Sequence, residues 1–302
     1  MTTVEIAETV DTVSDDLVEA PLVVEKQKRR IGPLDIIGPL MVFGLFVGSW
    51  YFMHHWGMRH LFDKPGFLLP PPHEILYDSF VREVPQPNGS TLVPRTALLK
   101  ALWQTTKLTM LGLSISITLG VLLAVVMAPT RWLERSISPF LVALQAVPIL
   151  VIAPVLGSMF GYEFRTRLIV CVIISIVPIV TNTIFGLRSA DQGQHDLFTL
   201  KGASRLTRMI KLQLPAGLPA MFTGFRISAG LAVIGAVVGE LFNRLGEKGI
   251  GVLMDEYRSR NQFTYTYGAL LLSSLLGIAV FFLFGWLQKL ATGKWHEAPQ
   301  TS

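Results

Sequence analysis

The 302-residue chain is 51% hydrophobic and only 16% charged, with a mean hydropathy of +0.50. This composition is too apolar for an ordinary soluble protein of this length and indicates a polytopic membrane protein. The net charge of +5 does not indicate nucleic-acid binding, because the basic residues gather at the ends of apolar segments without interleaved aromatic residues. The single cysteine, Cys171, excludes an intrachain disulfide.

Residues 1–30 are expected to form a disordered cytoplasmic tail. They are acidic at first and basic from 26 to 30, with almost no apolar periodicity. The basic cluster directly precedes the first apolar run, which favours a cytoplasmic N-terminus by the positive-inside rule.

Six apolar stretches are long enough to cross a membrane as helices, which takes about 20 residues. They cover residues 34–56, 105–128, 137–160, 168–187, 218–242 and 265–287. The sequence therefore predicts an all-α transmembrane domain over residues 31–290. Because six crossings return the chain to its starting side, residues 291–302 are expected to be a second cytoplasmic tail.

The outer connection 57–98 is rich in proline. Residues 73–80 follow three consecutive prolines and are expected to form a short helix. This long connection separates the first span from the other five, which predicts a five-helix core with one added N-terminal helix.

The inner loop 188–217 is polar and basic although it lies between two apolar runs. Asp196 is expected near a helix N-terminus, Gly202 in a tight turn, and Pro215 at the break before the next span. Basic residues recur at helical spacing and make one face positive: Arg205, Arg208 and Lys211. The loop is interpreted as a docking surface for a soluble partner, with a basic helix lying on the membrane as the alternative.

The order of residues in this loop resembles a known signature. Residues 196–215 read DLF, three residues, Gly202, nine residues, and LQLP. This is similar to the EAA motif of permease subunits of ATP-binding-cassette (ABC) importers, E-A-A-x3-G-x9-I-x-L-P, with every spacing kept. Leu197 and Phe198 depart from the two alanines of that motif.

Three further segments resemble permeases of the nitrate, sulfonate, taurine and bicarbonate group. They are LLPPPHEIL, ALQAVPILVIAPVLGSMFG and GASRLTRMIKLQLPAGLPAMFTGFRISAG. Relatives with this kind of permease also carry vitamin precursors such as pyrimidines, so the resemblance leaves the substrate open.

The resemblance implies a type I ABC importer permease, working with two copies of a cytoplasmic ATPase, a second permease copy, an outer solute-binding protein and the lipid bilayer. ATP would be bound by the ATPase, because this chain has no G-x-x-x-x-G-K-[ST] loop. No cofactor or metal is expected in the chain itself. The implied coupling residues are Asp196, Leu197, Phe198, Gly202, Ala203, Ser204, Arg205, Arg208, Leu212, Leu214 and Pro215.

Polar residues inside the spans are candidates for lining the solute pathway, because each is costly in hydrocarbon. For Gln145 and Asn182, pathway lining and hydrogen bonding between helices stay open. Glu240 is expected to be an interfacial carboxylate paired with a neighbour, and Arg226 to reach the inner interface or another span. The pathway candidates are Gln145, Pro148, Thr181, Asn182, Ser228 and Glu240.

Small residues within the spans are suited either to close helix packing or to gating. These are Gly112, Gly120, Gly224, Gly230, Gly235, Gly239 and Gly277. An ATP-independent secondary transporter or channel is the alternative function. It would require a buried carboxylate or histidine relay, and the sequence indicates neither, since all six histidines fall at span ends, in loops or in the tail. Motifs of a membrane enzyme are absent from the sequence.

Overall fold

The computed structural model describes residues 32–85, 91–92 and 94–293, and it divides the chain into two compact units, residues 1–51 and 52–302. In the first unit, helix α2 (Pro33–Phe52) includes Pro39 and exposes apolar side chains along its length. Residues Asp35–His60 are long and apolar enough to cross a membrane. The predicted N-terminal tail and nearly all of the C-terminal tail lie outside the described residues.

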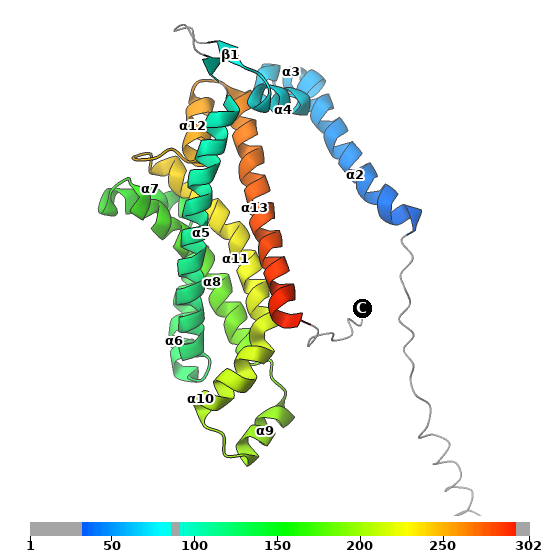
Figure 1. The fold of residues 1–302 in the computed structure, drawn as a ribbon. Coiled ribbons are helices and arrows are strands. Elements are labelled where there is room, and N and C mark those ends of the chain that lie inside the picture. Colours follow the sequence, from blue (N-terminus) through cyan, green and yellow to red (C-terminus); the bar gives the residue numbers. More distant parts are fainter. Residues whose placement is uncertain (1–31, 86–90, 93, 294–302) are drawn as a thin grey trace, which may run out of the picture. The chain divides into compact units, whose positions relative to one another are not determined.

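Four long helices run side by side in the second unit (Figure 1). They are α5 (Pro94–Met127), α8 (Phe164–Leu187), α11 (Leu214–Phe242) and α13 (Phe263–Thr292). Helix α11 packs against α8 and α13, and α8 also packs against α5. One cluster of their buried apolar residues, which includes Leu108, Cys171, Phe225 and Val280, draws on all four helices. Each helix meets the length and hydropathy of a membrane span, as predicted.

The predicted span over 137–160 is not one continuous helix. The segment forms two helices, α6 (Arg131–Ala146) and α7 (Ile149–Phe160), which are bent by 99°. The break falls at Pro148, whose ring forces Val147 into extended backbone with ψ 127. Helix α7 projects sideways from the bundle (Figure 1). The described residues therefore contain five helices able to span a membrane, or six if the bent pair is one span.

Short elements cap one end of the bundle. The predicted helix at 73–80 is confirmed as α4 (Pro72–Phe80), which has a proline in its first turn. Helix α12 (Ile250–Ser259) packs against α13, α11 and α5. The remaining short elements are η1 (Met53–Gly57), α3 (Met58–His60), η2 (Gly66–Leu68), β1 (Val84–Pro85) and β2 (Thr91–Leu92). The two-residue strands pair antiparallel, with Val84 opposite Leu92.

Glycines bring the backbones of α8 and α11 into direct contact. A Cβ atom on Gly186 would lie 2.6 Å from the carbonyl oxygen of Gly217, and one on Gly235 would lie 2.9 Å from Cα of Cys171. Gly112, Gly120, Gly224 and Gly239 have similarly close neighbours, whereas Gly230 and Gly277 have none within 4 Å. Close packing therefore accounts for five of the seven predicted glycines.

A buried polar cluster joins three helices at the α12 end. The Glu240 side chain accepts hydrogen bonds from Oγ1 of Thr105 on α5, at 2.9 and 3.0 Å, and from the backbone N–H of Gly251 on α12, at 2.8 Å. Thr105 Oγ1 in turn accepts from the backbone N–H of Ile250 at 2.8 Å. Glu240 is only 1% exposed, so it is paired with neighbours, as expected, but inside the protein rather than at its surface. Hydrogen-bond donors from two other helices make its burial tolerable.

Arg167 on α8 holds the loop that follows α11. Its guanidinium donates to the carbonyl oxygens of Asn243 at 2.7 Å, Leu245 at 2.6 Å and Glu247 at 2.8 Å. Charge-assisted hydrogen bonds of this kind are stronger than those between neutral groups. The loop between α11 and α12 is thereby fixed to α8 as well as to α11.

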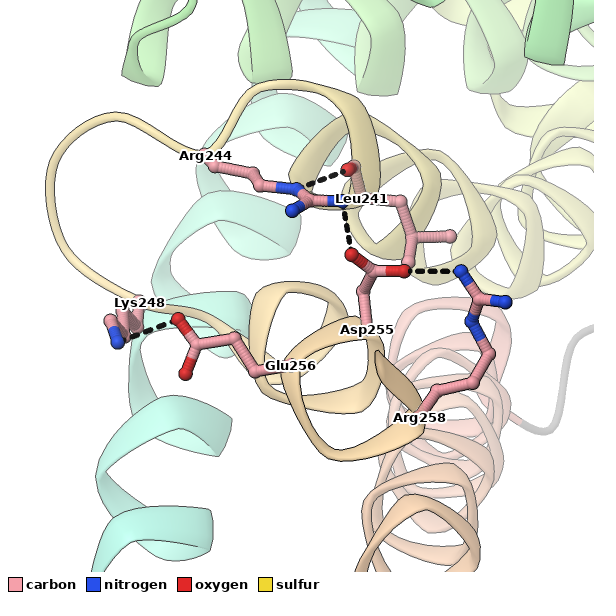
Figure 2. A network of polar contacts seen from close by, with 6 residues as sticks. All are labelled: Leu241, Arg244, Lys248, Asp255, Glu256 and Arg258. Atoms are coloured by element: carbon pink, nitrogen blue, oxygen red, sulfur yellow. Dashed lines mark hydrogen bonds and ion pairs between the residues drawn. The ribbon is translucent and has the colours of Figure 1, made fainter. Parts of the chain in front are cut away.

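Ion pairs join α12 to the loop that precedes it (Figure 2). The nearly buried carboxylate of Asp255 pairs with Arg244 and, at 2.8 Å, with Arg258. Lys248 and Glu256 form a second pair at 2.6 Å. Exposed pairs add little stability, but the two arginines offset the cost of burying Asp255.

Replacing Glu240 with alanine is expected to lower the thermal midpoint of the purified protein, because the Gly251 N–H and the Thr105 hydroxyl lose their buried acceptor. The cost is about 1–3 kcal/mol. Thr105→Val breaks the same network. The double variant should therefore be less destabilised than the sum of the two single variants, by about 0.5–3 kcal/mol.

Thr118→Val is the matched control on the same helix, since the exposed Thr118 hydroxyl bonds only to its own helix at Ser114. It should leave the midpoint nearly unchanged. Additive effects of the Glu240 and Thr105 substitutions would contradict a shared network.

Candidate functional site

A helical hairpin lies at the opposite end of the bundle from α12 (Figure 1). Helices α9 (Gln192–Leu200) and α10 (Arg205–Arg208) are joined by a turn in which Gly202 has φ +65. The Gly202 N–H bonds to Thr199 O at 2.9 Å, and the Ala203 N–H bonds to Phe198 O at 3.0 Å. These two bonds form a Schellman closure, which favours glycine. The predicted tight turn at Gly202 is confirmed.

Two side-chain contacts fix α10 against α9. The Ser204 hydroxyl caps α10 by accepting from the Thr207 N–H at 3.2 Å. The Arg208 guanidinium donates to Thr199 Oγ1 on α9 at 2.9 Å. Ser204 and Arg208, both predicted coupling residues, therefore shape the hairpin.

Two expectations for this loop are wrong. Asp196 lies inside α9, where its carboxylate accepts from the Gln192 amide at 3.3 Å, because Asp191 occupies the position before the helix. Pro215 does not end the helical segment, which runs continuously from Arg205 to Phe242. A π-helical turn, η3 (Met209–Gln213), directly precedes Leu214 and places the proline in the first turn of α11, where its missing N–H does little harm.

The hairpin separates exposed apolar residues from buried anchors. Leu200 is 86% exposed and Leu206 is 69% exposed, with Leu197 and Ile210 also exposed. In contrast, Leu212 is buried, and Leu214 packs against the core of the long helices. Large exposed apolar residues on a polar hairpin are typical of a protein-binding surface. The sequence interpretation named Leu197 but not Leu200, Leu206 or Ile210, although their presence in a basic loop was a usable signal.

Arg188 secures the base of the hairpin, a role that the sequence interpretation missed. Its guanidinium bonds to the Glu134 carboxylate on α6 through two nitrogens, at 2.9 and 2.5 Å, and to Ala128 O at 3.1 Å. The sequence feature that could have indicated this role is the position of Arg188 directly after an apolar run. Of the three residues of the predicted basic face, Arg205 and Lys211 are exposed but Arg208 is half-buried. The face is therefore only partly open to solvent.

The pathway candidates fall into two groups. Gln145 and Thr181 are exposed and line one hollow of about 400 Å³ between α6 and α8, and Pro148 lies at the bend between α6 and α7. Asn182 donates to Pro178 O within its own helix at 2.8 Å, and the buried Ser228 donates to Ser175 O on α8 at 2.6 Å. A pathway role for these residues and for Glu240 stays a prediction.

Among the pathway candidates, Glu240 is a buried carboxylate. Its oxygens are occupied by Thr105 and Gly251, which is the arrangement of a structural clamp. Arg226 lies in mid-span with its guanidinium 4.3 Å from the centre of the Phe281 ring on α13, so it pairs with another span through a cation–π contact.

A family model described as "Binding-protein-dependent transport system inner membrane component" matches residues 116–294. A probable ABC transporter permease protein of Haemophilus influenzae is 30% identical over 256 residues, which are 83% of this chain and 95% of the relative. A formylaminopyrimidine transport permease of Halalkalibacterium halodurans is 35% identical over 57% of this chain and 68% of its own. A bicarbonate transport system permease of Synechococcus elongatus is 27% identical over 59% and 64%.

A solved amino acid ABC transporter superposes on 66% of this chain and 94% of its own, with a TM-score of 0.50 and 16% identity. This likeness supports the fold alone, whereas the family model and the relatives carry the function. The chain therefore belongs to the family of binding-protein-dependent transport system inner membrane components, as the loop signature indicated, and is the inner-membrane permease subunit of an ABC importer.

Proposed function

We propose that the α9–α10 hairpin docks on the ATPase subunit and carries its movement into the bundle. The importer family implies an ATPase and a solute-binding protein as partners. The observation that carries the proposal is the hairpin itself: a tight turn at Gly202, exposed leucines on its surface, a buried anchor at Leu212 and a half-buried one at Leu214. Such a hairpin presents apolar contacts to a partner while remaining fixed to α11.

Two copies of this chain would form the channel, with one ATPase subunit under each hairpin. Helix α7 supports this arrangement, since it projects from the bundle and exposes Val151, Val155 and Met159. The basic residues at 26–30 and in the hairpin favour a cytoplasmic N-terminus and a cytoplasmic hairpin. The α12 end would then face the solute-binding protein.

The substrate is proposed to be a small pyrimidine-like heterocycle. The formylaminopyrimidine permease is 35% identical to this chain and the bicarbonate permease 27% identical, over similar shares of the chain. The higher identity favours the heterocycle over the small anion. Selectivity would reside largely in the separate binding protein.

Replacing Gly202 with valine is expected to abolish co-purification with the ATPase subunit and ATP-dependent uptake. A β-branched residue is strongly disfavoured at φ +65, so the turn that holds α9 against α10 would open. Co-purification from membranes and uptake into proteoliposomes measure the two effects.

Gly193→Val is the matched control, because Gly193 lies within α9 on the same hairpin and has only a distant side-chain neighbour at 3.8 Å. It should retain most of the ATPase binding. Normal binding by the Gly202 variant, with correct membrane insertion, would contradict the proposed docking role.

The orientation predicts how introduced cysteines react in intact cells. Leu206→Cys, on the hairpin, should react with a membrane-impermeant maleimide only after permeabilisation, whereas Gln262→Cys, at the α12 end, should react directly. Both parent residues are exposed, and the native Cys171 is fully buried and gives little background. Labelling of Leu206→Cys in intact cells would reverse the topology.

The substrate proposal predicts that the cognate binding protein retains a pyrimidine-like heterocycle on purification, detectable by mass spectrometry of the released ligand. Adding that compound should drive ATP-dependent uptake through the reconstituted complex. Retention of nitrate, bicarbonate or a sulfonate instead would overturn the substrate class and leave the permease role intact.

A further inference from the structure

A polar cavity of about 740 Å³ lies where the hairpin meets the bundle. It is lined from α6 by Arg131 and Arg135, from the end of α8 by Arg188, and from α10 by Arg208. The carboxylates in its lining are Glu134 and Asp196. Four arginines face two carboxylates in a concave space, so the cavity carries a net positive charge and focuses a positive potential.

The two carboxylates leave much of this charge uncompensated. Arg188 takes both oxygens of Glu134, and Asp196 accepts from the neutral Gln192 amide. Arg131 and Arg135 form no ion pair within the described part of the chain. Arg208 donates one bond to Thr199, while its Nε is buried with no hydrogen-bond partner among the described residues. The excess of arginines over carboxylates in the lining therefore favours an anionic ligand.

The position of the cavity restricts the kind of ligand. Helix α5 ends at Met127 and α8 ends at Leu187, directly beside the cavity, so the arginines lie where the membrane spans end. Phosphate groups of lipids occupy this depth, and basic pockets between helices on the cytoplasmic side bind anionic headgroups. Arginine is also the side chain best suited to bidentate phosphate binding.

We propose that this cavity binds a phosphate group that bridges α6, α8 and the α9–α10 hairpin. The cytoplasmic placement rests on the orientation given under Proposed function. The phosphate would accept hydrogen bonds from Arg131 and Arg135 on α6 and from the Arg208 guanidinium on the hairpin. By joining these elements, it would hold the hairpin at a fixed angle to the spans. The phosphate comes either from an anionic phospholipid or from a soluble phosphate.

The test measures binding to the purified full-length permease without the ATPase, so its result does not depend on coupling. Short-chain phosphatidylglycerol and phosphatidylcholine are titrated and followed by native mass spectrometry, and inorganic phosphate is titrated by calorimetry. Arg131→Gln/Arg135→Gln should weaken phosphate-group binding roughly 30-fold, about fivefold for each cation removed. Both arginines are exposed and form no described ion pair, so the fold should be retained.

Arg95→Gln/Lys289→Gln removes the same charge from exposed positions outside the cavity and is the matched control. It should change the affinity less than about twofold, because neither residue lines the cavity and exposed charges are screened by salt. If the cavity variant fails to fold, the wild-type affinity for phosphatidylglycerol should still fall as ionic strength rises, while phosphatidylcholine stays unaffected.

Loss of phosphatidylglycerol binding in the cavity variant supports the site and assigns it to lipid. Loss of inorganic phosphate binding alone supports the site and assigns it to a soluble anion. Equal binding of phosphatidylglycerol and phosphatidylcholine, or equal losses in the cavity and control variants, would overturn the proposal. Failure of the ATPase to bind the hairpin would instead contradict the proposed function and leave this binding result unchanged.

Discussion

Backbone contact between α8 and α11 is the constraint on which the mechanics of this permease depend. The two helices meet at Gly186 and Gly217 beside the hairpin, and again at Arg167 and Gly239 near the α12 end. The hairpin joins the end of one helix to the start of the other, so any displacement of it acts on both. Contacts this close leave no space in which side chains could absorb the movement. Helices α8 and α11 are therefore expected to move together as one rigid body.

The polar side chains buried between α8 and α11 make this helix pair stiffer and connect it to neighbouring helices. Ser116 on α5 bonds to Ser175 on α8 at 2.7 Å, and Ser228 on α11 donates to the Ser175 carbonyl. At the α12 end, the charged side chains of Glu240 and Arg167 also form hydrogen bonds to other segments of the chain. Polar atoms within a bilayer must find partners inside the protein. Here those partners lie on other helices or on the loop after α11, so satisfying them also ties the long helices to one another and to the α12 end.

The sequence predicted the features that follow from local chemistry. Apolar length indicated the long helices, and the glycine with its fixed spacing indicated the hairpin. Features decided by tertiary contacts were missed. Pro148 was named only as a pathway candidate, yet the chain bends there by 99°. Glu240 was expected at the interface because it lies near the end of its span. Its burial depends on Thr105, 135 residues away, and on Gly251 of α12, which hydropathy alone does not reveal. The π-helical turn before Pro215 has no simple sequence signal.

The spacing of the loop signature has a geometric explanation. Gly202 reverses the chain, and the residues after it form α10 and the π-helical turn, which together bring Leu212 and Leu214 onto the core. Inserting or deleting one residue would rotate these anchors away from the bundle, since each residue turns an α-helix by about 100°. The start of the signature is under no such constraint, because Leu197 is 51% exposed. We infer that the glycine and the spacing preserve the shape of the hairpin, while the exposed positions before it are fitted to a particular ATPase.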